Sequence, residues 1–493
     1  MKEQVAQEID SLLKKADEYS EKLDFRKAIE QYEKAVALES ADAAMYLCYI
    51  YSQGLPPIQK DLKKAFLYCE KAAQWGDVDA MYKLAYFYKN GIGTERNLEK
   101  CILLLKKLLE AGETDAAEKL GTIYQRMGNL QEAFHYTKIA ADAGNPYALE
   151  DLAHYYEEGI VVDENPAEAQ RLFTEAVERI REKANNDNCF AQAWMGDLYY
   201  EGKEFYGIGV DYEKAVFWFK KAANGNDASS QNKLGLCYKY GLGVEQNYVK
   251  AEYCFRQASR NNDVLAMCNL ALLYKEGKGV ERDVKMALKL MNQALEMGSH
   301  TAATNLGQMY LTGDEVEIDR EKGIRLLSMA VDEGEADAAF KLGTFLLEED
   351  RSEEDRQRAV ALLVQSATRG FIRAKCNLAN CYLEGFGCKA DFNAAFTLFS
   401  EICEREQSRR PNVKIDQQKS AEGFYIIPEE ANFDLYGEAY YHLALLHYFG
   451  KGTKQDTAEA IRLLRMSRSF GFCKVNRVVE PLIKLIEDGA SDG

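Results

Sequence analysis

Few residues of this chain have the spacing that catalysis or metal binding requires. The chain has five histidines: His135, His154, His300, His442 and His447. No two of them stand four apart, the spacing that puts two metal ligands on one helix face. Cys376, Cys381 and Cys388 lie close together in sequence, but their spacing matches no usual zinc site. We therefore predict packed side chains here, with no metal and no cofactor.

Catalytic motifs are equally scarce. The sequence contains no H-E-x-x-H, no G-x-S-x-G, no Walker loop and no G-x-G-x-x-G. Its one S-x-x-K, from Ser11 to Lys14, stands without the other motifs of penicillin-binding enzymes and is read as part of a polar helix face. We therefore predict that the protein is not an enzyme. An enzyme with an unrecognised site remains the alternative.

The charge of the chain bears on its partners. Sixty-two Lys and Arg residues against seventy-nine Asp and Glu residues give a net charge of −17, which phosphate backbones and anionic membrane surfaces repel. No apolar run approaches the roughly 18 residues of a membrane span, and the acidic start MKEQVAQEID is unlike a signal peptide. We expect a cytoplasmic protein that binds one or more proteins, and neither nucleic acid nor the membrane interior. A homo-oligomer is allowed but not predicted.

The sequence contains an internal repeat, and the structure that this repeat forms must position any binding or catalytic site. Five segments of 25 residues align without a gap, and five of the ten spacings between anchor residues are 36 residues. The anchor recurs at Leu47, Leu84, Leu120, Leu152, Met195, Leu234, Leu270, Leu306, Leu342, Leu378 and Leu443. Gly or Ala follows it in most units, which lets two helices approach closely. Four places after the anchor an aromatic residue such as Tyr88 lies one helical turn away and packs inward.

Each repeat also carries residues that end a first helix and begin a second one. Glycines such as Gly241 and Gly277 stand where a first helix must end, because Gly accepts the left-handed conformation of a C-cap. Thirteen residues after the anchor stands a preferred N-cap: Asn97, Asn165, Asn247, Asp283, Asp319, Asp355, Asp391 or Asp456. The unit is therefore helix, turn, helix. Extra residues after one second helix (REKANNDNC) interrupt the period.

The consensus A-x-x-L-G-x-x-Y-x-x-G-x-G-V-x-x-D-x-x-K-A resembles the Sel-1-like repeat, a relative of the tetratricopeptide repeat, over most of residues 42 to 470. The resemblance implies an all-α fold, a right-handed α/α solenoid (superhelix) of about twelve antiparallel helix hairpins. It also implies adaptor roles. We therefore expect a non-catalytic scaffold that binds segments of partner proteins along a concave groove. A co-chaperone that binds acidic peptide tails is a further alternative, and it would need a groove lined by Lys and Arg.

The repeat divides the chain into five parts. Residues 1–41 resemble a tetratricopeptide hairpin, and 42–407 form the main array. Residues 408–433 are an insertion, 434–473 the last repeat, and 474–493 a segment that caps the open end of the stack.

Binding residues are expected on the first helix of each hairpin, which by resemblance lines the concave side. Asn269, Asn305 and Asn377 each precede an anchor, and a side-chain amide can both donate to and accept from a peptide backbone. The alternative is that these amides bond to a neighbouring helix.

Two further groups are binding candidates. Exposed aromatic residues make binding hot spots, and the candidates are Tyr49, Tyr82 and Tyr86 near one end of the groove and Tyr441, Tyr448 and Phe449 near the other. Packing between repeats is their alternative. In the insertion, Arg409, Arg410, Phe424 and Tyr425 combine basic and apolar groups that would fold over the groove or dock a partner. A disordered excursion is the alternative for that segment.

Overall fold

A computed structural model describes residues 2–348, 352–409 and 433–470, together with residues 479, 482–484 and 486. Apart from the isolated bridge between Lys203 and Ile208, the regular structure of these residues is entirely helical. The predicted all-α class is therefore confirmed. The chain divides into two compact units, Met1–Asn186 and Asp187–Gly493, and each is described by itself.

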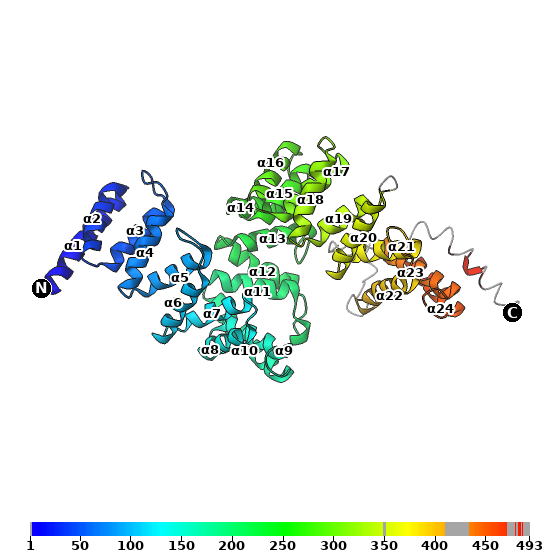
Figure 1. Ribbon diagram of the computed structural model, residues 1–493, viewed down its shortest axis with the longest axis horizontal. Helices are drawn as coiled ribbons and strands as arrows, with labels where there is room; N and C mark the ends of the chain where they lie inside the picture. The colour runs from blue at the N-terminus through cyan, green and yellow to red at the C-terminus, as the bar shows by residue number, and fades with distance from the viewer. Residues whose placement is uncertain are drawn as a thin grey trace. The chain divides into compact units, whose positions relative to one another are not determined.

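Unit 1 is built from consecutive helix pairs (Figure 1). Its helices are α1 (Lys2–Glu21), α2 (Phe25–Ala37), α3 (Ala41–Gln53), α4 (Leu62–Gln74), α5 (Val78–Asn90), α6 (Leu98–Glu110), α7 (Asp115–Arg126), α8 (Leu130–Asp142), α9 (Pro146–Glu157) and α10 (Pro166–Asn185). The sequence suggested that the extra residues REKAN follow the second helix, but the structure shows that they belong to it. They prolong α10, which has 20 residues where most second helices have 13.

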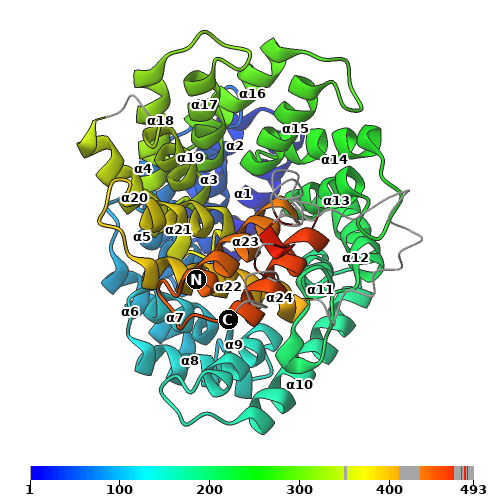
Figure 2. The same ribbon diagram turned by 90° about the vertical axis from the view of Figure 1, so that its right-hand side faces the viewer.

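Unit 2 continues the same pairing (Figures 1 and 2). Its helices are α11 (Cys189–Glu201), the 3₁₀-helix η1 (Glu204–Tyr206), α12 (Tyr212–Asn224), α13 (Ala228–Tyr240), α14 (Tyr248–Arg260), α15 (Val264–Glu276), α16 (Val284–Glu296), α17 (His300–Thr312), α18 (Arg320–Asp332), α19 (Ala336–Leu346), α20 (Glu353–Thr368), α21 (Ile372–Glu384), α22 (Phe392–Arg409), α23 (Phe433–Phe449) and α24 (Thr457–Ser469). The end of α22 includes the first two residues of the predicted insertion.

Each odd-numbered helix packs against the even-numbered helix that follows it, so the described residues form twelve consecutive hairpins, as predicted. Within unit 2, α15 also contacts α17, α17 contacts α19, and α19 contacts α21. These contacts place the odd-numbered helices on the more closely packed, inner side of that unit. The boundary between the two units falls in the chain between Asn186 and Asp187, inside the predicted array 42–407.

The helix ends follow the predicted caps, with one exception. The Asn247 side chain accepts a hydrogen bond from the backbone N–H of Lys250 at 2.9 Å, and Gly277 closes α15 in the left-handed conformation. At α20 the N-cap is Ser352, and the predicted cap Asp355 lies three residues inside the helix. The Asp355 backbone N–H donates to Ser352 Oγ at 3.1 Å, because a hydroxyl caps as well as a carboxylate.

The second glycine of the hairpin turn joins neighbouring hairpins. A Cβ added at Gly279 would lie 2.4 Å from the carbonyl carbon and oxygen of Tyr248, the first residue of the previous second helix. The matching Gly243 would place a Cβ 2.3 Å from the carbonyl of Tyr212. The sequence pattern assigned these glycines to the turn alone, whereas the structure gives them a packing role between repeats.

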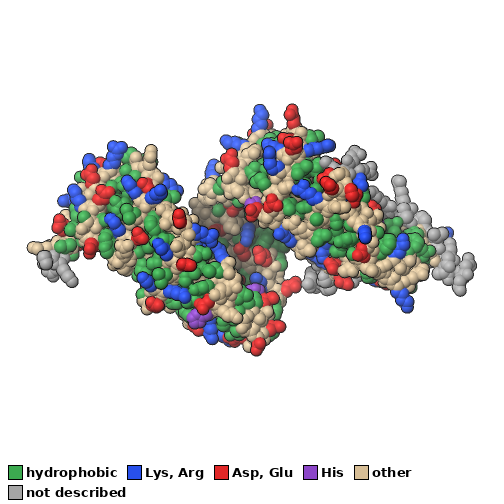
Figure 3. All heavy atoms as spheres, viewed as in Figure 1, with side chains coloured by type: hydrophobic (Ala, Val, Ile, Leu, Met, Phe, Trp, Pro, Cys, Tyr) green, Lys and Arg blue, Asp and Glu red, His purple; other side chains and the backbone are tan. Residues whose placement is uncertain are grey.

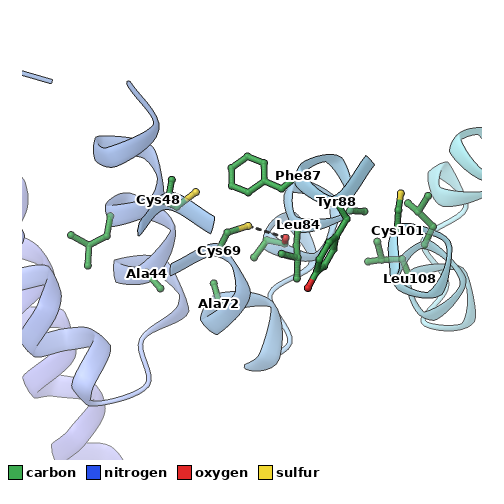
Figure 4. Packing of buried hydrophobic residues seen from close by; sticks show 14 of the residues in the cluster. Ala44, Cys48, Cys69, Ala72, Leu84, Phe87, Tyr88, Cys101 and Leu108 are labelled. Carbon is green, nitrogen blue, oxygen red and sulfur yellow. Dashed lines mark hydrogen bonds between the residues drawn. The ribbon is translucent and has the colours of Figure 1, made fainter. Parts of the chain in front are cut away.

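Small residues bring the helices of one hairpin together. A Cβ on Gly235, next to the anchor Leu234, would meet Phe255 of the partner helix at 2.5 Å, and Phe255 is fully buried. Figure 4 shows the same kind of core in unit 1, where Cys48 and Cys69 are buried and the Cys69 thiol donates to the Ala80 carbonyl oxygen at 3.4 Å. These cysteines pack as small hydrophobic side chains.

Candidate interaction surface

The three predicted asparagines occupy equivalent positions on α15, α17 and α21, each one residue before its anchor, and each is half-buried. The Asn269 side-chain amide donates to Asn232 Oδ1 on α13 at 3.0 Å. The Asn377 amide donates to Thr344 Oγ1 on α19 at 3.3 Å. Two of the three asparagines therefore link neighbouring hairpins, as the alternative interpretation held. Each amide also has further donor and acceptor capacity for a ligand.

Other polar groups share this side of unit 2. We call the six residues on the odd-numbered helices α13 to α21 the polar row: Asn232, Asn269, Asn305, Thr344, Asn377 and Asn380. The Asn380 amide donates to Glu438 Oε1 at 3.0 Å, while its buried Oδ1 has no hydrogen-bond partner among the described residues. Asn232, Thr344 and Asn380 were not predicted from the sequence. Aligning the second residue before and after each anchor would have found them.

Lysines near the polar row are held by carboxylates. Lys233 Nζ contacts Asp197 Oδ1 at 2.6 Å, and Lys341 Nζ contacts Asp337 Oδ2 at 2.6 Å. Burial raises the pKa of Asp197, and the Lys233 ammonium acts against that rise. These pairs offset the positive charge of both lysines on this side of the unit.

In unit 1 the three predicted tyrosines lie on α3 and α5. Tyr49 and Tyr86 each stand two residues after an anchor, and their exposed fractions are 51% and 57%. Tyr82 is half-buried, with Lys119 Nζ 5.9 Å from its ring centroid. Figure 3 shows hydrophobic side chains, tyrosines included, interspersed with acidic and basic ones over the visible surface. Tyr49 and Tyr86 are therefore available for contact, whereas Tyr82 is partly committed to packing.

The three predicted aromatic residues of α23 are divided between surface and core. Phe449 has an exposed fraction of 61%, and its ring lies edge-to-face with Tyr448 at 5.0 Å between centroids. Tyr448 and Tyr441 are half-buried against the core of the last repeats. Nearby His442 stacks on Phe399 at 5.3 Å, and burial lowers the pKa of its imidazole. Phe449 is thus the most available of the three.

Several of the predicted binding residues fall outside what the structure describes. Arg410, Phe424 and Tyr425 lie outside the described residues, and for Arg409 only the backbone, at the end of α22, is described. Within the described part of the chain, no group of three His, Cys, Asp or Glu side chains is arranged to hold a metal ion. No described helix is long and apolar enough to cross a membrane.

Comparison with known proteins adds a family match over most of the chain. A family model described as "Sel1 repeat" matches residues 41–77, 78–113, 115–145, 146–179, 189–227, 228–263, 264–299, 300–335, 336–371, 372–406 and 437–468. These boundaries follow the hairpins, so each matched unit is one odd-numbered helix with the even-numbered helix that follows.

Solved structures with the same architecture are similar at low identity. The protective antigen c5321 of uropathogenic Escherichia coli, which has an SLR fold, is 23% identical over 92% of this chain and 90% of its own, with a TM-score of 0.46. A Sel1 repeat protein from Oxalobacter formigenes is 23% identical over 67% and 93%, with a TM-score of 0.39. Immunity protein Pa5087 of Pseudomonas aeruginosa is 17% identical over 45% and 81%, with a TM-score of 0.34.

Proposed function

The chain belongs to the Sel1 repeat family, and from that premise we propose that it is a non-catalytic scaffold whose odd-numbered helices hold extended segments of partner proteins. The observation that carries this proposal is the polar row of unit 2. Side-chain amides and a hydroxyl recur there at one-hairpin intervals over five helices. An extended peptide presents N–H and C=O groups along its length, and an amide side chain can bond to either.

The arrangement fits a scaffold better than an enzyme. An enzyme needs reactive groups, such as a base, an acid or a nucleophile, that converge on one pocket. The polar row instead distributes neutral groups over five helices, with one or two per helix, and its member Asn232 is buried. Neutral groups can hydrogen-bond to a peptide backbone without reacting with it. Their repetition suits an extended ligand better than a reaction at a single centre.

The co-chaperone alternative is less well supported. Acidic peptide tails would require unpaired cations on the inner side of the helices. Lys233 and Lys341 are paired there with Asp197 and Asp337. We also propose the cytoplasm as the compartment, because buried free thiols such as Cys48 and Cys69 suit reducing conditions.

The proposal is tested by replacing Asn269, Asn305 and Asn377 together with Ala in the full-length chain. A partner that co-purifies in stoichiometric amount with the wild-type protein is expected to be lost. Because two hydrogen bonds between hairpins disappear, the variant should also lose about 1–3 kcal/mol of stability, so binding is measured below its melting transition.

Asn292→Ala is the matched control. Asn292 lies exposed on α16, and among the described residues its amide bonds only to the Leu288 carbonyl oxygen of the same helix, at 2.7 Å. This variant should keep the partner. Normal partner binding by the folded triple variant would reject the polar row as the binding surface.

A further inference from the structure

A depression beside the start of α4 differs in charge from the chain as a whole. It has a volume of about 870 Å³, and residues of three consecutive hairpins, from α2 to the turn between α5 and α6, line it. Four of the lining side chains are cationic: Arg26, Lys60, Lys63 and Lys64. We call this depression with its four cations the basic pocket. It lies entirely within unit 1, in a chain whose net charge is −17.

The cations of the basic pocket are exposed, and carboxylates do not pair with them. None of the four forms a salt bridge with a described residue. The preceding hairpin differs, because there Lys27 Nζ contacts Asp24 Oδ2, on the N-cap of its helix, at 3.0 Å. Lys64 occupies the equivalent position of α4, but its ammonium lies over the Tyr51 ring, 4.9 Å from the centroid. The cationic groups of the pocket therefore remain available to an anionic ligand.

Backbone contacts fix the frame that carries these cations. Asp61 is the one carboxylate of the lining, and it serves as the N-cap of α4. Its side chain accepts a hydrogen bond from the Lys64 backbone N–H at 3.0 Å, and its own backbone N–H donates to the Tyr51 carbonyl oxygen at 2.9 Å. A Cβ added at Gly93 would lie 2.0 Å from the Leu62 carbonyl oxygen, so the turn of the next hairpin rests directly on the start of α4. The cationic side chains thus project from backbone that is held on both sides.

The basic charge does not follow from the repeat itself. The equivalent depression at the turn between α17 and α18 has a volume of about 830 Å³ and is likewise lined by the tyrosine four places after the anchor and by the N-cap aspartate. Its charged lining residues are mostly acidic: Glu317, Asp319, Arg320 and Glu321. Of the second helices whose N-cap is described, only α4 has Lys or Arg just before the cap and at both its second and third positions. The sequence of this hairpin, and not its fold, therefore sets the charge of the pocket.

We propose that the basic pocket binds the phosphate group of a phosphorylated serine or threonine in a partner protein. Such a group carries about 1.5–2 negative charges near pH 7 and has three strong acceptor oxygens. The Arg26 guanidinium can form two parallel hydrogen bonds with phosphate oxygens, and the lysine ammonium groups add point charges around it. A carboxylate has a single charge and two oxygens, so it would satisfy fewer of the four cations.

The surroundings of the pocket favour a single phosphorylated residue over other sources of phosphate. Small-molecule sites are clefts that bury most of the ligand surface, whereas this depression is lined largely by exposed side chains. A nucleic acid or a membrane presents many phosphates at once, and the acidic chain repels those that lie outside the pocket. The choice of a protein partner rests on the proposed scaffold function. The pocket extends that function, because it selects partners by their phosphorylation.

The test measures the binding of short fluorescent peptides to the full-length chain by anisotropy. One peptide carries a single phosphoserine in a neutral sequence of Gly, Ala and Ser, and two others carry Ser or Glu at that position. Arg26→Gln, Lys60→Gln and Lys63→Gln together should weaken binding of the phosphoserine peptide at least about tenfold, because charge-assisted hydrogen bonds to the phosphate are lost. Lys64 is left in place because its side chain packs on Tyr51. The three changed side chains are exposed, so the variant should fold, and circular dichroism checks that it does.

A matched variant controls for net charge. Lys107→Gln, Lys138→Gln and Arg181→Gln, on α6, α8 and α10, remove the same number of positive charges at exposed positions outside the pocket lining. This variant should bind the phosphoserine peptide as the wild type does. Inorganic phosphate should displace the peptide from the wild type, since the phosphate group carries the interaction.

Four results would overturn the proposed site. The phosphoserine peptide could fail to bind the wild type, or the Glu peptide could bind as tightly, which would remove the preference for phosphate. Equal weakening by both triple variants would attribute the effect to net charge. Binding of the wild type to vesicles of anionic lipid, lost in the pocket variant, would assign the pocket to a membrane surface. Each of these results leaves the scaffold proposal to be judged by the polar-row variant and its own partner.

Discussion

The second glycine of the hairpin turn offers a sharp test of how the repeats are held together. Gly279→Ala introduces a Cβ at a φ of +74°, 2.4 Å from the carbonyl of Tyr248 in the previous hairpin. A non-glycine residue in the left-handed region costs about 1–2 kcal/mol. Overpacking against backbone that cannot rotate away adds about 1–3 kcal/mol. Together these effects predict a loss of roughly 2–5 kcal/mol.

Gly298→Ala is the matched comparison, since φ is +85° there and nothing lies within 4 Å of the added Cβ. It should show the conformational cost alone, about 1–2 kcal/mol. Urea unfolding followed by far-UV circular dichroism measures the difference between the two variants. Hydrogen exchange should place the extra loss at α14 to α16. An equal loss in both variants would refute the packing role of Gly279.

Three more perturbations follow from the core, the caps and the carboxylates. Phe255→Ala removes a fully buried ring and should cost about 3–5 kcal/mol, measured by the same urea titration; a loss under about 1 kcal/mol would contradict the packing described. Asn247→Ala removes the cap of α14 and should cost about 1 kcal/mol, with faster amide exchange at Lys250 as its signature. Asp151→Asn should raise the melting temperature relative to wild type above about pH 6 and leave it unchanged below about pH 4. The folded carboxyl has a pKa of about 6 against about 4 when unfolded, so the folded chain binds the proton more tightly and the wild type loses stability as pH rises through that window. A constant difference at all pH values would mean that the titration of Asp151 is not responsible.

The hairpins could be predicted from sequence because their signals are local. Asn247 and Gly277 act within a few residues of their own helix ends, so their types suffice to place those ends. Asp355 shows the limit of this reasoning. A nearer Ser352 satisfies the same backbone groups, and only the structure shows which cap is used.

The contacts between hairpins could not be predicted in the same way. The bond from Asn269 to Asn232 joins residues 37 apart in sequence, and the approach of Gly279 to Tyr248 depends on how one hairpin rests on the next. The tyrosines at 49 and 86 were named because Tyr is favoured at binding hot spots, and the structure shows both to be exposed.

The claim that odd-numbered helices bind the partner is tested most directly by placing a photo-crosslinking amino acid at single positions in the native cell. Asn305, on α17, reports on the polar row, and Asn292, on α16, reports on the exposed side of an even-numbered helix. We predict that a partner protein crosslinks from position 305 and not from position 292. Crosslinking of that partner from position 292 with none from position 305 would contradict the account.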